Sequence, residues 1–399
     1  IENYKNKSAP DIFINISHFL DHFIMLIFAK AAYDASKHFS ITYDQIIFYG
    51  ALGFILFGAT APLAAYLADK FSRAALMVIF HFGIGISAIL TGLSNNLVQF
   101  AISIGLVGMF ASIYHPVGIA LLIQNNYRIG YRLGINGVFG NMGVAAAPLV
   151  TAFLLAYGNW SICFLVPGIA CLLYGVIFYN SLVTVEKPYN FKKGNISAKF
   201  APNWFQVFIA LMIATCSGGF IFGSLTFFIP RYFEIYMNNF TTSVLLTGIL
   251  ASLVYAIASF AQIVVGSLIE RFSPKLILLL IGFGQIIFIL LSSVVTDLTL
   301  FIVMIFAMSF VFGQIPITDT ILSRYVPDIH RSKVLSVKFL LNLSVGALVL
   351  PVSSLMLKNG FQMSSLFSVL SLISIFVVIS AIFLPAQKWS DRLDSNRPR

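Results

Sequence analysis

Two stretches, AAYLADKFSRA (Ala64–Ala74) and VGSLIERFSPK (Val265–Lys275), decide the fold, because they repeat one pattern 201 residues apart. In both, an acid, a base, a phenylalanine and a serine follow one another. Further pairs keep a spacing of 200 to 203 residues, namely Pro116 and Pro316, Arg128 and Arg331, Gly143 and Gly346, and Pro148 and Pro351. A spacing that stays near 200 over half of the chain indicates an internal duplication.

Each copy of the repeat is apolar enough to lie in a membrane. Of the 399 residues, 59% are hydrophobic and 10% charged, whereas a soluble domain carries about 25% charged residues. A crossing helix needs about 20 apolar residues. The predicted spans are 12–33, 45–68, 75–94, 98–122, 134–157, 161–183, 205–229, 243–269, 275–295, 299–322, 334–357 and 364–386. The sequence therefore predicts an all-α polytopic membrane protein with two pseudo-symmetric six-helix bundles, residues 1–184 and 205–399, joined by a linker over 185–204.

The positive charges are distributed unequally between the two sides of the predicted spans. The net charge is +10, and nineteen Lys and Arg residues fall on the side of the termini. The opposite side holds only Lys37, Arg231 and Lys358. Cytoplasmic loops carry such an excess, so both termini are expected in the cytoplasm. The basic balance is a topology signal and gives no support for nucleic-acid binding.

The twelve spans and the repeated loop resemble the major facilitator superfamily over essentially the whole chain. The family signature, Gly-x-x-x-Asp-Arg/Lys-x-Gly-Arg-Arg/Lys, is matched by Ala65–Arg73 with its acid and two bases retained and both glycines replaced by small residues. Parallel six-helix repeats build that transporter fold. The resemblance implies a multi-pass protein of the bacterial inner membrane. It also implies a monomer in the lipid bilayer that carries a small molecule and uses no cofactor apart from a coupling proton.

Short segments resemble one branch of this family, the fosmidomycin-resistance type of efflux transporter. They are HFLDH (18–22), FSIT (39–42), SIYHP (112–116) and GNMGVAAAP (140–148). The exporter pattern Gly-x8-Gly-x3-Gly-Pro is matched by Gly134, Gly143, Ala147 and Pro148, with alanine for the third glycine. The pattern implies proton-driven export, although an ordinary packing face with a kink explains the same residues.

Charged residues present in both copies are expected to serve the motion that the two bundles share. They are Asp69, Lys70, Arg73, Glu270 and Arg271, joined by the loop residues Arg128 and Arg331. At the ends of helices such side chains pair with helix termini and with each other while one side is closed. For the two loop arginines, solvated charges that follow the positive-inside rule remain an equal alternative.

Charged residues present in one copy only are candidates for substrate and proton chemistry. At 100° per residue, the first span carries Asn15, His18, Asp21 and His22 along one stripe. Such a stripe is expected to face a wet cavity rather than lipid. His115 lies about 10 Å from the same end as His18 at ~1.5 Å per residue, so we expect these two histidines at one level.

Three roles are compatible with the stripe. Asp21 binds the coupling proton, because burial favours the neutral form of a carboxyl group and imidazoles titrate near neutral pH. Alternatively, His18 and His22 ligate a metal or a metal chelate, or the groups are structural. A central aspartate costs about 2.5–3.5 kcal/mol on insertion scales, which favours the proton or substrate role, and no residue is assigned as a metal ligand.

The second copy has its own unmatched polar residues, namely Asp319, Lys338, Gln314 and Asn342. An ion pair between Asp319 and Lys338 would gate the cytoplasmic side or bind a charged substrate; alternatively, Lys338 extends to the interface. Lys30 and Asp34, four residues apart, are expected to form a surface pair.

The sequence therefore predicts a proton-coupled exporter of a small organic molecule that works by alternating access. Uptake, or carriage of a metal or siderophore-like chelate, is the alternative within transport, and a receptor is a remote one. An enzyme is not supported, because the chain has no Gly-x-Ser-x-Gly, no His-Glu-x-x-His and no phosphate-binding loop.

Overall fold

The computed structural model describes residues 7–122, 129–184, 200–326 and 328–385. Within them, twelve helices are long and apolar enough to cross a membrane, as predicted. In the first half these are α1 (Asp11–His38), α2 (Tyr43–Lys70), α3 (Arg73–Gly92), α4 (Leu97–Ala111) continued through α5 (Ile119–Leu122), α6 (Ile129–Tyr157) and α7 (Trp160–Asn180). In the second half they are α8 (Trp204–Tyr236), α9 (Val244–Ser259) continued by α10 (Ala261–Arg271), α11 (Pro274–Ser292), α12 (Asp297–Tyr325), α13 (Asp328–Ala347) continued by α14 (Val349–Lys358), and α15 (Met363–Phe383).

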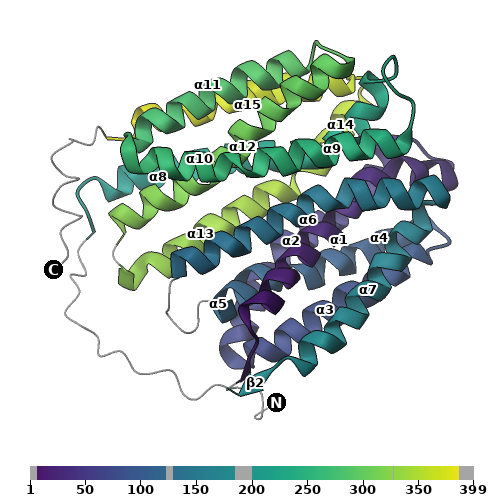
Figure 1. Cartoon of the computed structure of the whole chain (residues 1–399), viewed down its shortest axis with the longest axis horizontal. Helices are drawn as coiled ribbons and strands as arrows, with labels where there is room; N and C mark the ends of the chain where they lie inside the picture. Colours follow the sequence, from purple (N-terminus) through teal and green to yellow (C-terminus); the bar gives the residue numbers. More distant parts are fainter. Residues whose placement is uncertain (1–6, 123–128, 185–199, 327, 386–399) are drawn as a thin grey trace.

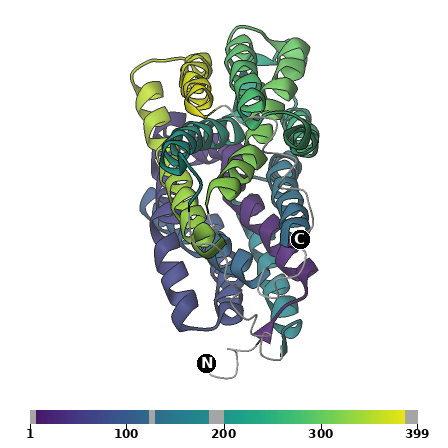
Figure 2. The same ribbon diagram turned by 90° about the vertical axis from the view of Figure 1, so that its left-hand side faces the viewer.

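The helices form two groups that lie one above the other in Figure 1, α1–α7 below and α8–α15 above. Figure 2 shows the same arrangement from the end at which α1 begins. We call this end the termini side and the opposite end, where α1 finishes and α2 begins, the distal side. The two halves meet where α6 packs on α9, α2 on α13 and α14, and α1 on α8.

The repeated Phe-Ser pair has the same backbone role in both halves. Phe71 follows α2 and Phe272 follows α10, each in extended conformation. Ser72 and Ser273 then precede α3 and α11, with φ of −74° and −62°. In the first half the Ser72 hydroxyl also accepts a hydrogen bond from Ala75 N at 3.3 Å, which is a helix cap. The duplication seen in the sequence is therefore a duplication of one helix–turn–helix geometry.

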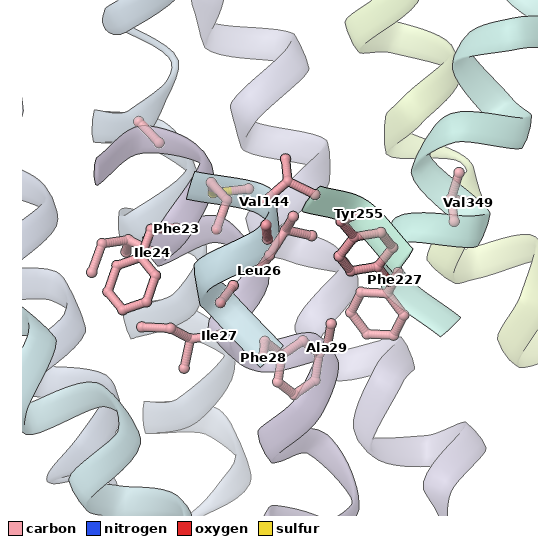
Figure 3. Packing of buried hydrophobic residues seen from close by; sticks show 14 of the residues in the cluster. Phe23, Ile24, Leu26, Ile27, Phe28, Ala29, Val144, Phe227, Tyr255 and Val349 are labelled. Atoms are coloured by element: carbon pink, nitrogen blue, oxygen red, sulfur yellow. The ribbon is translucent and has the colours of Figure 1, made fainter. Parts of the chain in front are cut away.

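Helix α1 is packed by protein on nearly every side. Its apolar residues Ile24, Ile27 and Phe28 are at most 1% exposed. Figure 3 shows this packing, in which Phe28 of α1 lies toward Phe227 of α8, with ring centroids 5.7 Å apart. Helix association in lipid depends on van der Waals packing and close backbone approach. A β-carbon at Gly143 of α6 would lie 2.3 Å from the Phe19 carbonyl oxygen, so glycine is what lets α6 approach α1.

Two helices run further than their predicted ends. Helix α1 continues past Tyr33 to His38, and α8 continues past Ile229 to Tyr236. The added turn of α8 carries Arg231 and Glu234, which contact α1 of the other half, whereas the added turn of α1 ends in the exposed residues Lys37 and His38. Charged residues in both turns lower the hydropathy, which explains why hydropathy alone ended both spans early. A two-residue antiparallel ladder between β1 (Lys7–Ser8) and β2 (Val183–Thr184) joins the start of α1 to the end of α7.

Candidate functional site

Three histidines and one aspartate meet inside the first half. The ring centroids of His18 and His22, one turn apart on α1, are 4.9 Å apart, and His115 lies 5.4 Å from each. The expected proximity of His18 and His115 is therefore observed. We call His18, His22 and His115 the histidine cluster. The carboxylate of Asp21 lies beside it, with Oδ2 3.5 Å from Nε2 of His115.

A π-helical turn, Tyr114–Gly118, brings His115 to this position. It interrupts the span between α4 and α5 and contains Pro116, which has no backbone N–H to donate and so cannot continue an α-helical ladder. Such turns insert one extra residue into a helix and occur often at functional sites. No sequence pattern predicted the turn, although the proline inside an apolar run marked where a helix is disturbed.

His18 is held by residues that the sequence analysis did not single out. Its Nδ1 donates to the Asn136 carbonyl at 2.7 Å, and its ring stacks on Tyr114 with centroids 4.7 Å apart. The Asn136 amide donates to Asn15 Oδ1 at 2.9 Å and to the Tyr114 hydroxyl at 2.8 Å. Asn15, a predicted site residue, is thus part of this network. A polar residue inside the predicted span 134–157 was the available signal for Asn136.

Asp21 is the least accommodated polar group of the site. Its side chain is 0% exposed, and neither carboxylate oxygen accepts a hydrogen bond from the described residues. Buried carboxylates usually accept several hydrogen bonds, so an exception calls for an explanation. Its burial on α1, between His18 and His22, puts it inside the bundle rather than on the outer surface. The wet cavity expected beside the stripe stays a prediction.

Three of the polar residues predicted in the second half each have their own contacts. Gln314 accepts from the Gln285 amide and donates to the Ala214 carbonyl, each at 2.8 Å. Lys338 is 8% exposed and donates to the Thr318 hydroxyl at 2.7 Å. Asn342 of α13 lies against α8, where a β-carbon at Gly219 would be 2.3 Å from its Oδ1. The side chain of Asp319 lies outside the described residues, so the predicted pair with Lys338 stays a prediction.

On the distal side, Lys30 joins the two halves, and the expectation of a surface pair with Asp34 is wrong. Lys30 is 2% exposed, and its Nζ lies 2.6 Å from Glu234 Oε1 of α8 and 2.9 Å from the Thr247 hydroxyl of α9. Asp34 instead accepts a hydrogen bond from the backbone N–H of Trp160 at 2.9 Å. Because α8 extends beyond its predicted end, Glu234 belongs to this helix and faces Lys30 of α1.

Arg231 completes this distal contact. Its guanidinium lies 2.8 Å from Glu234 Oε2 and 3.3 Å from the ring centre of Tyr33, on α1. Two cations thus share one carboxylate between the halves, and a cation–π contact adds to the ion pairs. We call Lys30, Glu234, Arg231 and Tyr33 the distal contact.

The expected gating residues on the termini side are described only in part. The Lys70 ammonium lies 4.5 Å from the ring centre of Tyr66, and Arg73 donates to the Ala120 carbonyl at 3.4 Å. Arg271 is exposed in the last turn of α10. Outside the described residues lie the side chains of Asp69, Glu270 and Arg331, and the whole of Arg128. The gating role stays a prediction.

The four residues of the exporter pattern lie along α6 and differ in their packing. Gly143 is required by the approach to α1, and Ala147 is fully buried. The Pro148 carbonyl lies 2.7 Å from a β-carbon placed at Gly248, where α6 meets α9 of the other half. A β-carbon at Gly134 would meet nothing within 4 Å. Close packing thus explains the glycine at 143 and leaves the one at 134 unexplained.

A sequence profile described as Major Facilitator Superfamily matches residues 12–349 and 233–399. The chain belongs to the Major Facilitator Superfamily. The superfamily consists of transporters rather than enzymes, which confirms the expectation that the chain is not an enzyme. The superfamily fold is also seen in the inward open xylose transporter XylE from E. coli, with a TM-score of 0.76, 13% identity, and coverage of 96% of this chain and 98% of that one.

Two proteins that are similar to the chain in sequence are also named as transport proteins. A probable hexose phosphate transport protein of Chlamydia pneumoniae is 27% identical over 141 residues, which are 35% of this chain and 31% of that one. The nitrate/nitrite transporter NrtP of Nostoc punctiforme is 24% identical over 238 residues, or 56% of this chain and 47% of that one. The chain thus spans less than half the length of either relative, and both names concern those proteins.

Proposed function

We propose that this superfamily member is a secondary transporter that exports a small organic molecule in exchange for protons. The observation that carries the proposal is Asp21, a fully buried carboxylate in a membrane span that accepts no hydrogen bond from the described residues. A central aspartate costs about 2.5–3.5 kcal/mol on insertion scales. A carboxylate kept in a membrane span at this cost, without hydrogen bonds from the described residues, supports a role in the transport cycle.

In this mechanism the two halves rock about a central site that faces one side of the membrane at a time. Asp21 accepts a proton on one side and releases it on the other, with His115 at 3.5 Å as its neighbour. His18 and His22 lie next to His115 and share its surroundings. Substrate and proton compete for one site, so binding of either favours release of the other.

The finer parts of the proposal rest on sequence features. Export, and the fosmidomycin-resistance branch, are supported by HFLDH (18–22), by SIYHP (112–116) and by the exporter pattern of α6. A bacterial inner membrane with both termini cytoplasmic is supported by the excess of Lys and Arg on the termini side. Under this orientation the distal contact closes the outer side, and the repeated loop charges gate the cytoplasmic side.

The same proposal assigns the parts of the chain. Residues 1–184 and 205–399 form the two moving units, 185–204 connects them, and one chain carries out the whole cycle. Gln314, Lys338 and Asn342 represent the contribution of the second half to the substrate site, and Asp319 is expected beside them.

Flux through proteoliposomes, with and without an imposed pH gradient, tests this function. The test compounds are a phosphonate-like anion, a lipophilic cation and an iron chelate. We expect the gradient to drive one of them in the wild type, and Asp21→Asn to abolish the driven component while leaving exchange of substrate for substrate. Comparing flux in vesicles that hold the protein in opposite orientations gives the direction of transport.

A matched control keeps the loss attributable to the site. Asp297→Asn removes a carboxylate at the start of α12 on the distal side, where its backbone φ of 57° suits asparagine as well as aspartate. This variant is expected to behave as the wild type does. Flux that ignores the gradient, with Asp21→Asn equal to the wild type, contradicts the proposal.

A further inference from the structure

The histidine cluster has the geometry of an incomplete metal site. One ligand nitrogen from each of His18, His22 and His115 can be chosen so that all three lie within 4.8 Å of one another. Zinc–imidazole bonds are about 2.0–2.1 Å long, so a small inward movement of these rings would bring all three nitrogens to one ion. Two of the ligands come from successive turns of α1 and the third from the π-helical turn, so tertiary packing assembles the group.

The His18 ring is oriented as a metal ligand requires. A carbonyl oxygen only accepts hydrogen bonds, so Nδ1 of His18 carries the proton in its contact with the Asn136 carbonyl at 2.7 Å. The lone pair is then on Nε2, which is buried and has no hydrogen-bond partner among the described residues. Metal-ligating histidines almost always donate their other ring N–H in this way. Gly140 makes room for the ring, because a β-carbon there would lie 2.6 Å from it.

Asp21 supplies the charge that such a site needs. Charged groups inside a membrane span usually pair with one another, and Asp21 places a buried carboxylate 3.5 Å from His115. Carboxylate–histidine–metal arrangements are the usual second layer of such sites. The absence of hydrogen bonds to Asp21 from the described residues is explained if an ion, through His115, is its electrostatic partner.

We propose that His18, His22 and His115 bind one divalent transition metal ion, with zinc as the representative, at the centre of the first half. Three imidazoles leave a fourth coordination position open. A water molecule or a donor atom of an organic ligand fills that position, so the ion arrives alone or as a chelate. As a binding site the cluster stands by itself, whereas metal or chelate as cargo rests on the transport function proposed above.

Zinc binding to the purified full chain tests the site directly. The protein carries a purification tag without histidines, and binding is measured by equilibrium dialysis in detergent. We expect one zinc per chain, and we expect His22→Ala and His115→Ala each to weaken binding by more than about 100-fold, since second-layer changes alone cost 10–100-fold. His38→Ala, an exposed histidine on the distal side, is the matched control and is expected to bind as the wild type does.

Two further measurements guard against variants that fail to fold. Gly140→Ala keeps all three histidines in the chain and is expected to weaken zinc binding by displacing the His18 ring. The visible spectrum of cobalt bound to the wild-type protein reports the coordination of the metal and needs no amino-acid substitution. We expect the spectrum of a four-coordinate ion. The proposal is overturned if the wild type binds no zinc, if cobalt shows only its hydrated spectrum, or if His38→Ala weakens binding as much as His115→Ala does.

A flux experiment with two conditions distinguishes whether the metal is carried as a free ion or as a chelate. Zinc alone and zinc with excess citrate are supplied to proteoliposomes, and uptake of metal and of citrate is counted. Citrate that moves with zinc identifies a chelate, and zinc alone identifies the free ion. Equilibrium binding uses no gradient, so a protein that couples to protons and binds no zinc overturns only this inference. A protein that binds zinc and ignores the pH gradient overturns only the function proposed above.

Discussion

The two halves share one architecture but contain different chemistry at their centres. The fourth span of the first half has a π-helical turn that presents His115, whereas the matching stretch of α12 remains α-helical through Pro316 and has Ile315 at the equivalent place. Around Asp21 the first half gathers ionisable side chains. Around Gln314 the second half gathers neutral groups, with Gln285 donating to Gln314 and Gln314 donating to the Ala214 carbonyl. The two copies share a scaffold, and the histidine cluster lies in the first of them.

The largest effect is expected where the halves are joined. In Glu234→Gln the buried Lys30 loses its carboxylate, and breaking a buried ion pair by removing one partner costs about 3–5 kcal/mol. The distal side then opens in a larger share of the molecules. Spin labels at Lys37 and Lys358, both exposed on the distal side, are expected to report a longer distance in a background without the native cysteines.

Lys30→Gln removes the other partner of the ion pair and serves as a comparison with Glu234→Gln. In this variant Glu234 keeps Arg231 as its partner at 2.8 Å. We expect a smaller shift than in Glu234→Gln. Equal label distances in the wild type and in Glu234→Gln would show that the distal contact does not hold the halves together.

The next effect separates the two copies of the fourth span. His115→Ala is expected to lower proton-driven flux by about 100-fold, the lower range for removal of a proton-transfer group. Ile315→Ala, at the matching position of the second half, is expected to change flux less than about twofold. Similar losses in both variants would place function in both halves and remove the contrast drawn above.

The smallest effect concerns the matched glycines Gly143 and Gly346. Gly143→Ala forces a β-carbon to 2.3 Å from the Phe19 carbonyl oxygen and is expected to destabilise the protein by about 1–3 kcal/mol. Gly346→Ala meets nothing within 4 Å and is expected to be neutral or stabilising by up to about 1 kcal/mol. Thermal unfolding in detergent measures both, and a lower midpoint for Gly346→Ala would contradict the packing argument.

Much of the fold follows from the sequence because its signals are local or repeated. Hydropathy marks twelve spans, and a constant spacing near 200 residues marks the duplication. The proximity of His18 and His115 also followed, because depth along a helix is set by a fixed rise per residue. These predictions required no knowledge of side-chain partners.

The remainder depends on contacts between distant residues. Lys30 and Glu234 are 204 residues apart, and no local pattern pairs them. The sequence analysis therefore paired Lys30 with Asp34, which is only four residues away. Asn136 reads as one polar residue in a span, and its role arises only where α6 crosses α1. The π-helical turn likewise depends on how Pro116 is accommodated by its neighbours.

The sharing of one carboxylate by two cations at the distal contact has a consequence for salt. Arg231 and Glu234 are three residues apart on one helix and move together, whereas Lys30 moves with α1. When the halves separate on the distal side, the second half keeps a neutral pair and the first half exposes a bare ammonium. Dissolved anions screen that charge within a Debye length of about 8 Å at physiological ionic strength. The ionic strength of the compartment on that side therefore sets part of the balance between the closed and open forms.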